Sequence, residues 1–114
     1  MNRTIVVLLA SIMSAGLSLG SISAHAAVDE DSAKSLIKKN KCGNCHAIDK
    51  KKDGPSFKAI AKEFSGKADA QATLFKHVTT SPTVEVDGKK EKHKQIKAKD
   101  EAEINNLIQW ILSR

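Results

Sequence analysis

Cys42-Gly43-Asn44-Cys45-His46 has the pattern C-x-x-C-H, which is the most informative motif of this sequence. Two thiols three positions apart can reach the two vinyl groups of one haem, and the adjacent histidine then lies under the iron. Imidazole is a good axial ligand for haem iron. The pattern therefore predicts one covalently attached haem c, with thioether bonds at Cys42 and Cys45 and with His46 as the proximal iron ligand.

Three other interpretations of the cysteine pair fit less well. A structural zinc site needs two further ligands, and His77 and His93 are 16 positions apart, too far for a finger-type pair. A thioredoxin-like redox pair needs a βαβ pattern, which the sequence lacks. A disulfide across two intervening residues has poor geometry. Haem attachment is the interpretation that the sequence favours.

Residues 1–26 have the pattern of a secretory signal peptide. Arg3 supplies a positive start, an apolar stretch begins at Ile5, and Ala24-His25-Ala26 fits the A-x-A cleavage pattern. The alternative is an uncleaved N-terminal anchor helix, against which the short apolar stretch argues. We expect cleavage after Ala26 and export to the periplasm.

The expected mature chain, residues 27–114, is one small domain. Removal of the signal takes 26 of the 114 residues and leaves 88, and the formal charge falls from +6 to +5 with the loss of Arg3. This length excludes a large multi-domain enzyme. The mature part has no apolar run of about 20 residues, so we expect no membrane span. Both methionines, Met1 and Met13, leave with the signal.

Four stretches have the spacing of short helices, so the fold class is expected to be all-α. The segment from Val84 to Gly88 alternates and could be a brief extended stretch before a turn, but one such segment makes no sheet. A core with few aromatic side chains needs a staple or a cofactor, and a haem would complete it. The expected helices run from an Asp31 or Ser32 cap to about Asn40, from Pro55 to Phe64, from Asp69 to Thr79, and from an Asp100 cap to the C-terminus.

Over almost all of its mature part the chain resembles the small bacterial class I cytochromes c. A first helix, the C-x-x-C-H motif, Gly54-Pro55, short middle helices and a last helix ending in Trp110-Ile111-Leu112-Ser113 follow in the same order. The resemblance implies a cytochrome c-like fold of about four helices around one haem. It also implies that the Pro55 carbonyl accepts from His46 Nδ1–H, although Pro55 could equally be an ordinary helix-start proline. Trp110 is expected at the haem edge or between the terminal helices.

The chain departs from that family on the distal side of the haem. The family places a methionine about 20 residues before the C-terminus, whereas the mature chain has none and carries His93 21 residues before its end. We expect His93 to be the distal ligand, with low-spin iron and a lowered reduction potential, because a Met/His pair raises the potential. The alternatives are His77, expected to point outward from its helix, a lysine, or an open sixth site.

These observations predict a periplasmic one-electron carrier that is not an enzyme. The alternatives are a small-gas binding or sensing protein with an open sixth site, and an electron-relay subunit of a dehydrogenase or reductase. Nucleic-acid binding is not expected, because no basic and aromatic residues interleave. We expect a monomer that forms transient complexes with acidic redox partners, guided by lysines at 38, 39, 41, 50–52, 89, 90, 92, 94, 97 and 99.

Overall fold

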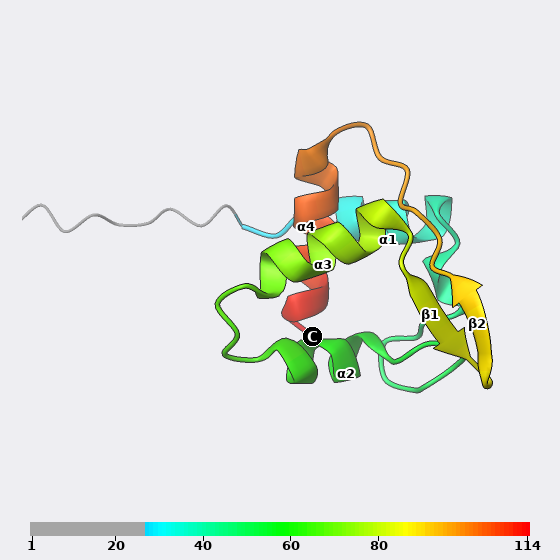
Figure 1. The fold of residues 1–114 in the computed structure, drawn as a ribbon. Coiled ribbons are helices and arrows are strands. Elements are labelled where there is room, and N and C mark those ends of the chain that lie inside the picture. Colours follow the sequence, from blue (N-terminus) through cyan, green and yellow to red (C-terminus); the bar gives the residue numbers. More distant parts are fainter. Residues whose placement is uncertain (1–26) are drawn as a thin grey trace, which may run out of the picture.

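The computed structural model describes residues 27–114, and the predicted signal peptide with its cleavage site lies outside the described residues. Figure 1 shows short helices and one β-hairpin, so the all-α expectation is confirmed for most of the described chain. None of the helices in this part is long and apolar enough to cross a membrane. The elements are α1 (Glu30–Lys39), the 3-10 helix η1 (Cys42–Asn44), α2 (Phe57–Phe64), α3 (Ala70–Thr80), β1 (Thr83–Val86), β2 (Lys89–Lys92) and α4 (Glu101–Leu112).

Acidic and hydroxyl side chains fix where the helices begin. Asp100 caps α4 as predicted, because its carboxylate accepts from the Glu103 backbone N–H at 3.0 Å. The first helix begins slightly earlier than predicted, because its cap is Asp29, which accepts from the Ser32 N–H at 2.9 Å. The cap of α2 is Ser56, so Pro55 precedes the helix instead of starting it.

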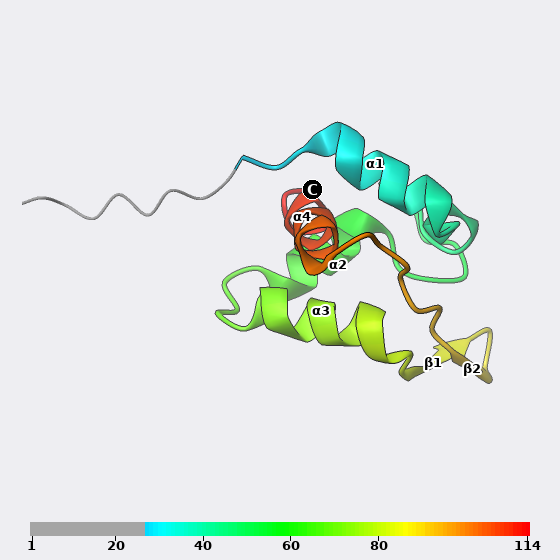
Figure 2. The same ribbon diagram turned by 90° about the horizontal axis from the view of Figure 1, so that it is seen from above.

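Helix α4 is the centre of the packing. It contacts α1, α2 and α3, and Figure 2 shows it nearly end-on between α1 and α3. Burial of a large apolar side chain stabilises a fold by about 1.5–3 kcal/mol. The small core therefore depends on a few side chains shared by α1, α2 and α4, which are Ala33, Leu36, Phe57, Leu107, Trp110 and Ile111.

Two asparagines hold the ends of α1. Asn106 exchanges two hydrogen bonds of 2.8 Å with the backbone of Asp29, at the start of the helix. At its other end, Asn40 donates to the Lys97 carbonyl at 3.0 Å and accepts from the Lys97 N–H at 2.8 Å. The second pair links the helix that precedes the cysteine motif to the loop that follows β2.

The β-hairpin corrects the expectation that the segment from Val84 to Gly88 makes no sheet. Strands β1 and β2 pair antiparallel, with Val84 opposite Glu91. Asp87 and Gly88 form the turn with φ of 51° and 76°, and positive φ at both central residues suits a two-residue hairpin. The partner strand was missed because Lys89–Lys92 is exposed throughout and has no apolar alternation.

Candidate haem site

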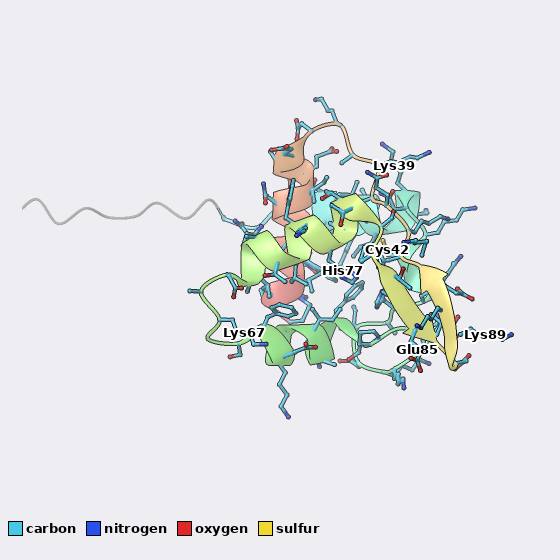
Figure 3. All side chains as sticks on the ribbon, viewed as in Figure 1. Lys39, Cys42, Lys67, His77, Glu85 and Lys89 are labelled. Atoms are coloured by element: carbon cyan, nitrogen blue, oxygen red, sulfur yellow. The ribbon has the colours of Figure 1, made fainter. Side chains whose placement is uncertain are left out.

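A cavity of about 670 Å³ lies between the helices and the hairpin, which is within the usual size of small-molecule and cofactor sites. Figure 3 labels Cys42 and His77 near the centre of the molecule. The wall contains both cysteines of the C-x-x-C-H motif and the three histidines of the described chain. The apolar part of the wall is formed by Ile37, Pro55, Phe57, Ile60, Phe64, Leu74, Val78, Val84, Val86, Ile96, Leu107, Ile108 and Ile111.

The cysteine motif forms a single tight turn at one side of the cavity. Backbone N–H groups of Cys45 and His46 both donate to the Cys42 carbonyl, at 3.2 and 2.9 Å. Neither cysteine is in a disulfide, and Cys42 is partly buried while Cys45 is exposed. Burial raises the pKa of the Cys42 thiol, which therefore stays protonated at neutral pH. The turn presents two free thiols and one imidazole to the same cavity.

The orientation of His46 is set by the segment that follows the motif. Its Nδ1 lies 2.7 Å from the Pro55 carbonyl oxygen, which is the contact that the family resemblance implies. An N–H at Nδ1 donates to this oxygen and leaves Nε2 as the nitrogen with a free lone pair. The Phe57 ring stacks against His46 with centroids 5.5 Å apart.

Gly54 makes this arrangement possible, a role that the sequence analysis did not assign. A Cβ at position 54 would lie 2.6 Å from His46 Cε1 and 3.0 Å from its Nδ1. The Gly54 N–H also donates to the Cys45 carbonyl at 2.8 Å, which holds the two segments together. The Gly-Pro pair was visible in the sequence, but the close approach that requires glycine appears only in three dimensions.

His93 lines the same cavity as His46. The two ring centroids are 6.2 Å apart, with the ring planes tilted by 48°. Two imidazoles that bind one metal ion from opposite sides, at about 2 Å per nitrogen, have centroids roughly 6 Å apart. His93 Nδ1 is buried and has no hydrogen-bond partner in the described structure. Because protein atoms enclose Nδ1, Nε2 is the nitrogen of this ring that is left for a ligand.

His77 also faces the cavity, so the expectation that it points outward is wrong. It is half-buried, and its ring packs edge-on against His93 with centroids 4.6 Å apart. Leu74, His77 and Val78 all line the cavity. Positions i, i+3 and i+4 share one helix face, so this spacing is the sequence signal that could have placed His77.

Burial keeps both His77 and His93 in the neutral form. Burial, followed by the nearby His46, lowers the pKa of His77. Burial is also the main cause that lowers the pKa of His93, and His77 contributes next. Both imidazoles are therefore neutral at neutral pH, and neutral imidazole is the ligand form.

Trp110 lies between the terminal helices and does not line the cavity. It is 1% exposed, belongs to the core shared by α1 and α4, and meets Phe57 edge-on at 5.5 Å. The Arg114 guanidinium lies 4.3 Å from its ring centroid. Of the two positions that the sequence left open, the structure therefore has the helix interface and not the haem edge.

The donor set fits a haem better than a bare metal ion. Within residues 27–114, no group of three or more His, Cys, Asp or Glu side chains is arranged to hold a metal ion. A structural zinc site needs four protein ligands. A haem brings four nitrogens of its own, so two imidazoles on opposite sides and two free thiols suffice.

Comparisons with known proteins agree with this geometry. The class 1 cytochrome MtoD from Sideroxydans lithotrophicus ES-1 is similar at 52% identity and a TM-score of 0.73, over 76% of this chain and 97% of that one. The wild-type cytochrome c552 of Nitrosomonas europaea is similar at 28% identity and a TM-score of 0.57, over 70% of this chain and 96% of that one. The cytochrome c-like fold is thereby confirmed.

Sequence comparison points the same way. Cytochrome c-551 of Pseudomonas aeruginosa is 40% identical over 62 residues, which are 54% of this chain and 59% of that protein, so the match spans less than two thirds of the relative. The family model for cytochrome c matches residues 31–114, which is most of the chain and all but its start in the described part. This chain therefore belongs to the cytochrome c family, whose members carry covalently bound haem c and transfer electrons rather than catalyse reactions.

Proposed function

We propose that this chain is a periplasmic one-electron carrier whose single haem iron is held by His46 and His93. Haem iron supplies the change between the ferric and ferrous states. The observation that carries the proposal is the pair of imidazole rings that both line the cavity, with centroids 6.2 Å apart, the separation expected for two imidazoles on one metal ion. With both axial positions filled by the protein, oxygen and peroxide find no open site, and electron transfer is favoured over catalysis.

Different residues of the chain would bind the cofactor covalently and coordinate its iron. Cys42 and Cys45 have free thiols at the same cavity wall and would form the two thioether bonds. The Pro55 carbonyl accepts from His46 Nδ1–H at 2.7 Å, which fixes the tautomer and raises the basicity of Nε2. His93 offers Nε2 from the other side.

A lowered reduction potential follows from this ligand pair. Residues 27–114 contain no methionine, so a Met/His pair is unavailable to the mature chain. Methionine opposite histidine raises the potential of a haem, and a second imidazole therefore gives a lower one. The proposed carrier would serve donors and acceptors of lower potential than a Met/His cytochrome of the same fold.

The lysines around the cavity favour an acidic docking partner. Lys41 follows α1, whereas Lys92 and Lys94 lie before and after His93, and all three side chains are exposed at residues that line the cavity. The wall also contains Asp53, Glu63, Glu85 and Glu91, so the positive charge is confined to the two segments that carry these lysines. Exposed lysines speed association with an acidic surface, and salt screens the attraction. We propose that a redox partner docks on these lysine-bearing segments in a transient complex and that the signal at residues 1–26 directs export.

The ligand assignment can be tested by the spectra of the oxidised holoprotein. We expect a low-spin electron paramagnetic resonance signal and no near-infrared methionine-to-iron band. His93→Ala should convert the iron to high spin, because it removes one of the two axial nitrogens. Lys94→Ala is the matched control, since it changes the neighbouring exposed residue and should leave the spectrum unaltered. A high-spin wild type, or a low-spin signal that survives in His93→Ala, contradicts the proposal.

A further inference from the structure

His77 is a cavity-lining histidine that the proposed ligand pair leaves without a role. Its ring meets His93 edge-on, with centroids 4.6 Å apart and planes at 66°. Edge-on contacts between aromatic rings are specific in geometry and attractive beyond the area that they bury. The contact therefore restrains the direction in which the His93 ring points.

The two histidines are also fixed relative to each other by the backbone. Three hydrogen bonds join the end of α3 and the residues just after it to the loop after β2. The bonds run from the His93 N–H to the Pro82 carbonyl at 2.8 Å, from the Gln95 side-chain amide to the Thr79 carbonyl at 2.7 Å, and from the Ile96 N–H to the Val78 carbonyl at 2.9 Å. The His77 ring is thereby held beside the His93 ring by the fold itself.

His93 needs such a restraint more than His46 does. A histidine that binds a metal usually donates its second ring N–H to an acceptor, which fixes the orientation of the ring. His46 has this acceptor in the Pro55 carbonyl, whereas His93 Nδ1 has no partner in good hydrogen-bond geometry among the described residues, and the neighbouring Lys94 backbone is the polar group that acts on the ring. Ring packing by His77 is therefore the main side-chain contact that orients His93.

We propose that His77 is a positioning residue for His93, and this inference rests on the proposed ligation by His46 and His93. The His77 ring holds the distal imidazole toward the cavity by packing, in the place of a hydrogen bond. Without the ring, His93 detaches from the iron more often. The sixth coordination position is then open to an added ligand for a larger fraction of the time.

Carbon monoxide binding to the reduced holoprotein measures this opening. His77→Ala should bind carbon monoxide about two- to tenfold faster than the wild type, since that is the range expected from loss of one aromatic contact. His77→Phe keeps an aromatic ring without the ring nitrogens and should bind at nearly the wild-type rate. Lys76→Ala changes an exposed neighbour on the same helix and should have no effect.

The ferric spectrum separates failure of this inference from failure of the ligand assignment. His77→Ala should stay low-spin, with shifted or broadened g values because the His93 ring is less constrained. The inference is overturned if His77→Ala binds carbon monoxide at the wild-type rate, or if His77→Phe is as fast as His77→Ala. A high-spin His77→Ala beside a low-spin His93→Ala overturns the inference and the ligand assignment together, because His77 would then be the ligand itself. Failure of the carbon monoxide prediction alone leaves the ligand assignment intact, since that assignment fails by a low-spin signal in His93→Ala.

Discussion

The two sides of the cavity hold their histidines by different means. His46 is fixed by residues close to it in the chain: a 2.7 Å contact to the Pro55 carbonyl, a glycine that leaves room for the ring, and a stacked Phe57. His93 lies in a loop among exposed lysines, and backbone bonds to α3 and the His77 ring hold it in place. The His46 side, which is proximal in the proposed ligation, therefore depends on local sequence, whereas the His93 side, the proposed distal side, depends on tertiary packing.

The largest effect on stability is expected from Gly54→Ala, a substitution on the proximal side of the cavity. The added Cβ would lie 2.6 Å from His46 Cε1, so either the ring or the backbone must move. Overpacking of this kind costs about 1–3 kcal/mol of unfolding free energy, and a displaced His46 should also change the g values of the ferric protein. Denaturant unfolding and electron paramagnetic resonance of the holoprotein measure the two effects.

Gly43→Ala is the matched control for that variant. An added Cβ there meets nothing within 4 Å, so this substitution should change the unfolding free energy by less than about 0.5 kcal/mol. Equal unfolding curves and equal spectra for the two variants would refute the argument that Gly54 makes room for His46.

The proximal half of the site could be predicted from the sequence because its determinants are local. The spacing of Cys42, Cys45 and His46 lies within one turn of chain, and the family resemblance supplied the Pro55 contact. The last helix could also be predicted from its sequence. Its apolar spacing indicates one buried face, and all four residues of that face are buried, namely Ile104, Leu107, Ile108 and Ile111. Such patterns involve residues close together in the sequence, so they can be recognised without knowledge of the tertiary structure.

The distal half could be predicted only in part, because its determinants are far apart in the sequence. The direction of His77 depends on which face of α3 meets the loop after β2, and two hydrogen bonds between residues distant in the sequence, at Val78 and Thr79, decide that. The exposed strand β2 has no apolar pattern, so its pairing with β1 was invisible although Asp87-Gly88 is a favourable turn. His93 was proposed as a ligand from its distance to the end of the chain, not from the packing around it.

A smaller effect is expected from Asn40→Ala, which loosens the distal side. Asn40 makes two hydrogen bonds to the backbone of Lys97, in the loop that carries His93. Their loss should lower the unfolding free energy by about 1–2 kcal/mol. Because the loop becomes freer, carbon monoxide binding to the reduced holoprotein should also become faster.

Asn106→Ala is an unusually close control for Asn40→Ala. Asn106 makes the same kind of paired contact, with the backbone of Asp29 at the opposite end of α1. Its removal should lower stability by a similar amount but leave the carbon monoxide rate unchanged. If both variants speed carbon monoxide binding equally, the rate reports global loosening, and the distinction between the two sides is lost.

The smallest effect is expected from Glu30→Gln, at a site outside the cavity wall. An ion pair with Lys34 at 2.7 Å lowers the pKa of the Glu30 carboxyl below its ordinary value of 4.5, chiefly through the hydrogen bond and then through the charge. A carboxyl whose pKa is lower in the folded state contributes stability above its unfolded pKa, and this contribution is lost as the pH falls through the folded pKa. The wild type should therefore be slightly more stable than Glu30→Gln at neutral pH, and the two should converge as the pH falls through the lowered pKa of the Glu30 carboxyl. Thermal unfolding across that pH range measures the difference in stability.

The rate of carbon monoxide binding is the control for this variant. It should be the same in both proteins at every pH, because Glu30 contacts neither the His46 side nor the His93 side of the cavity. A changed rate in Glu30→Gln would mean that a distant surface charge alters the loop that carries His93.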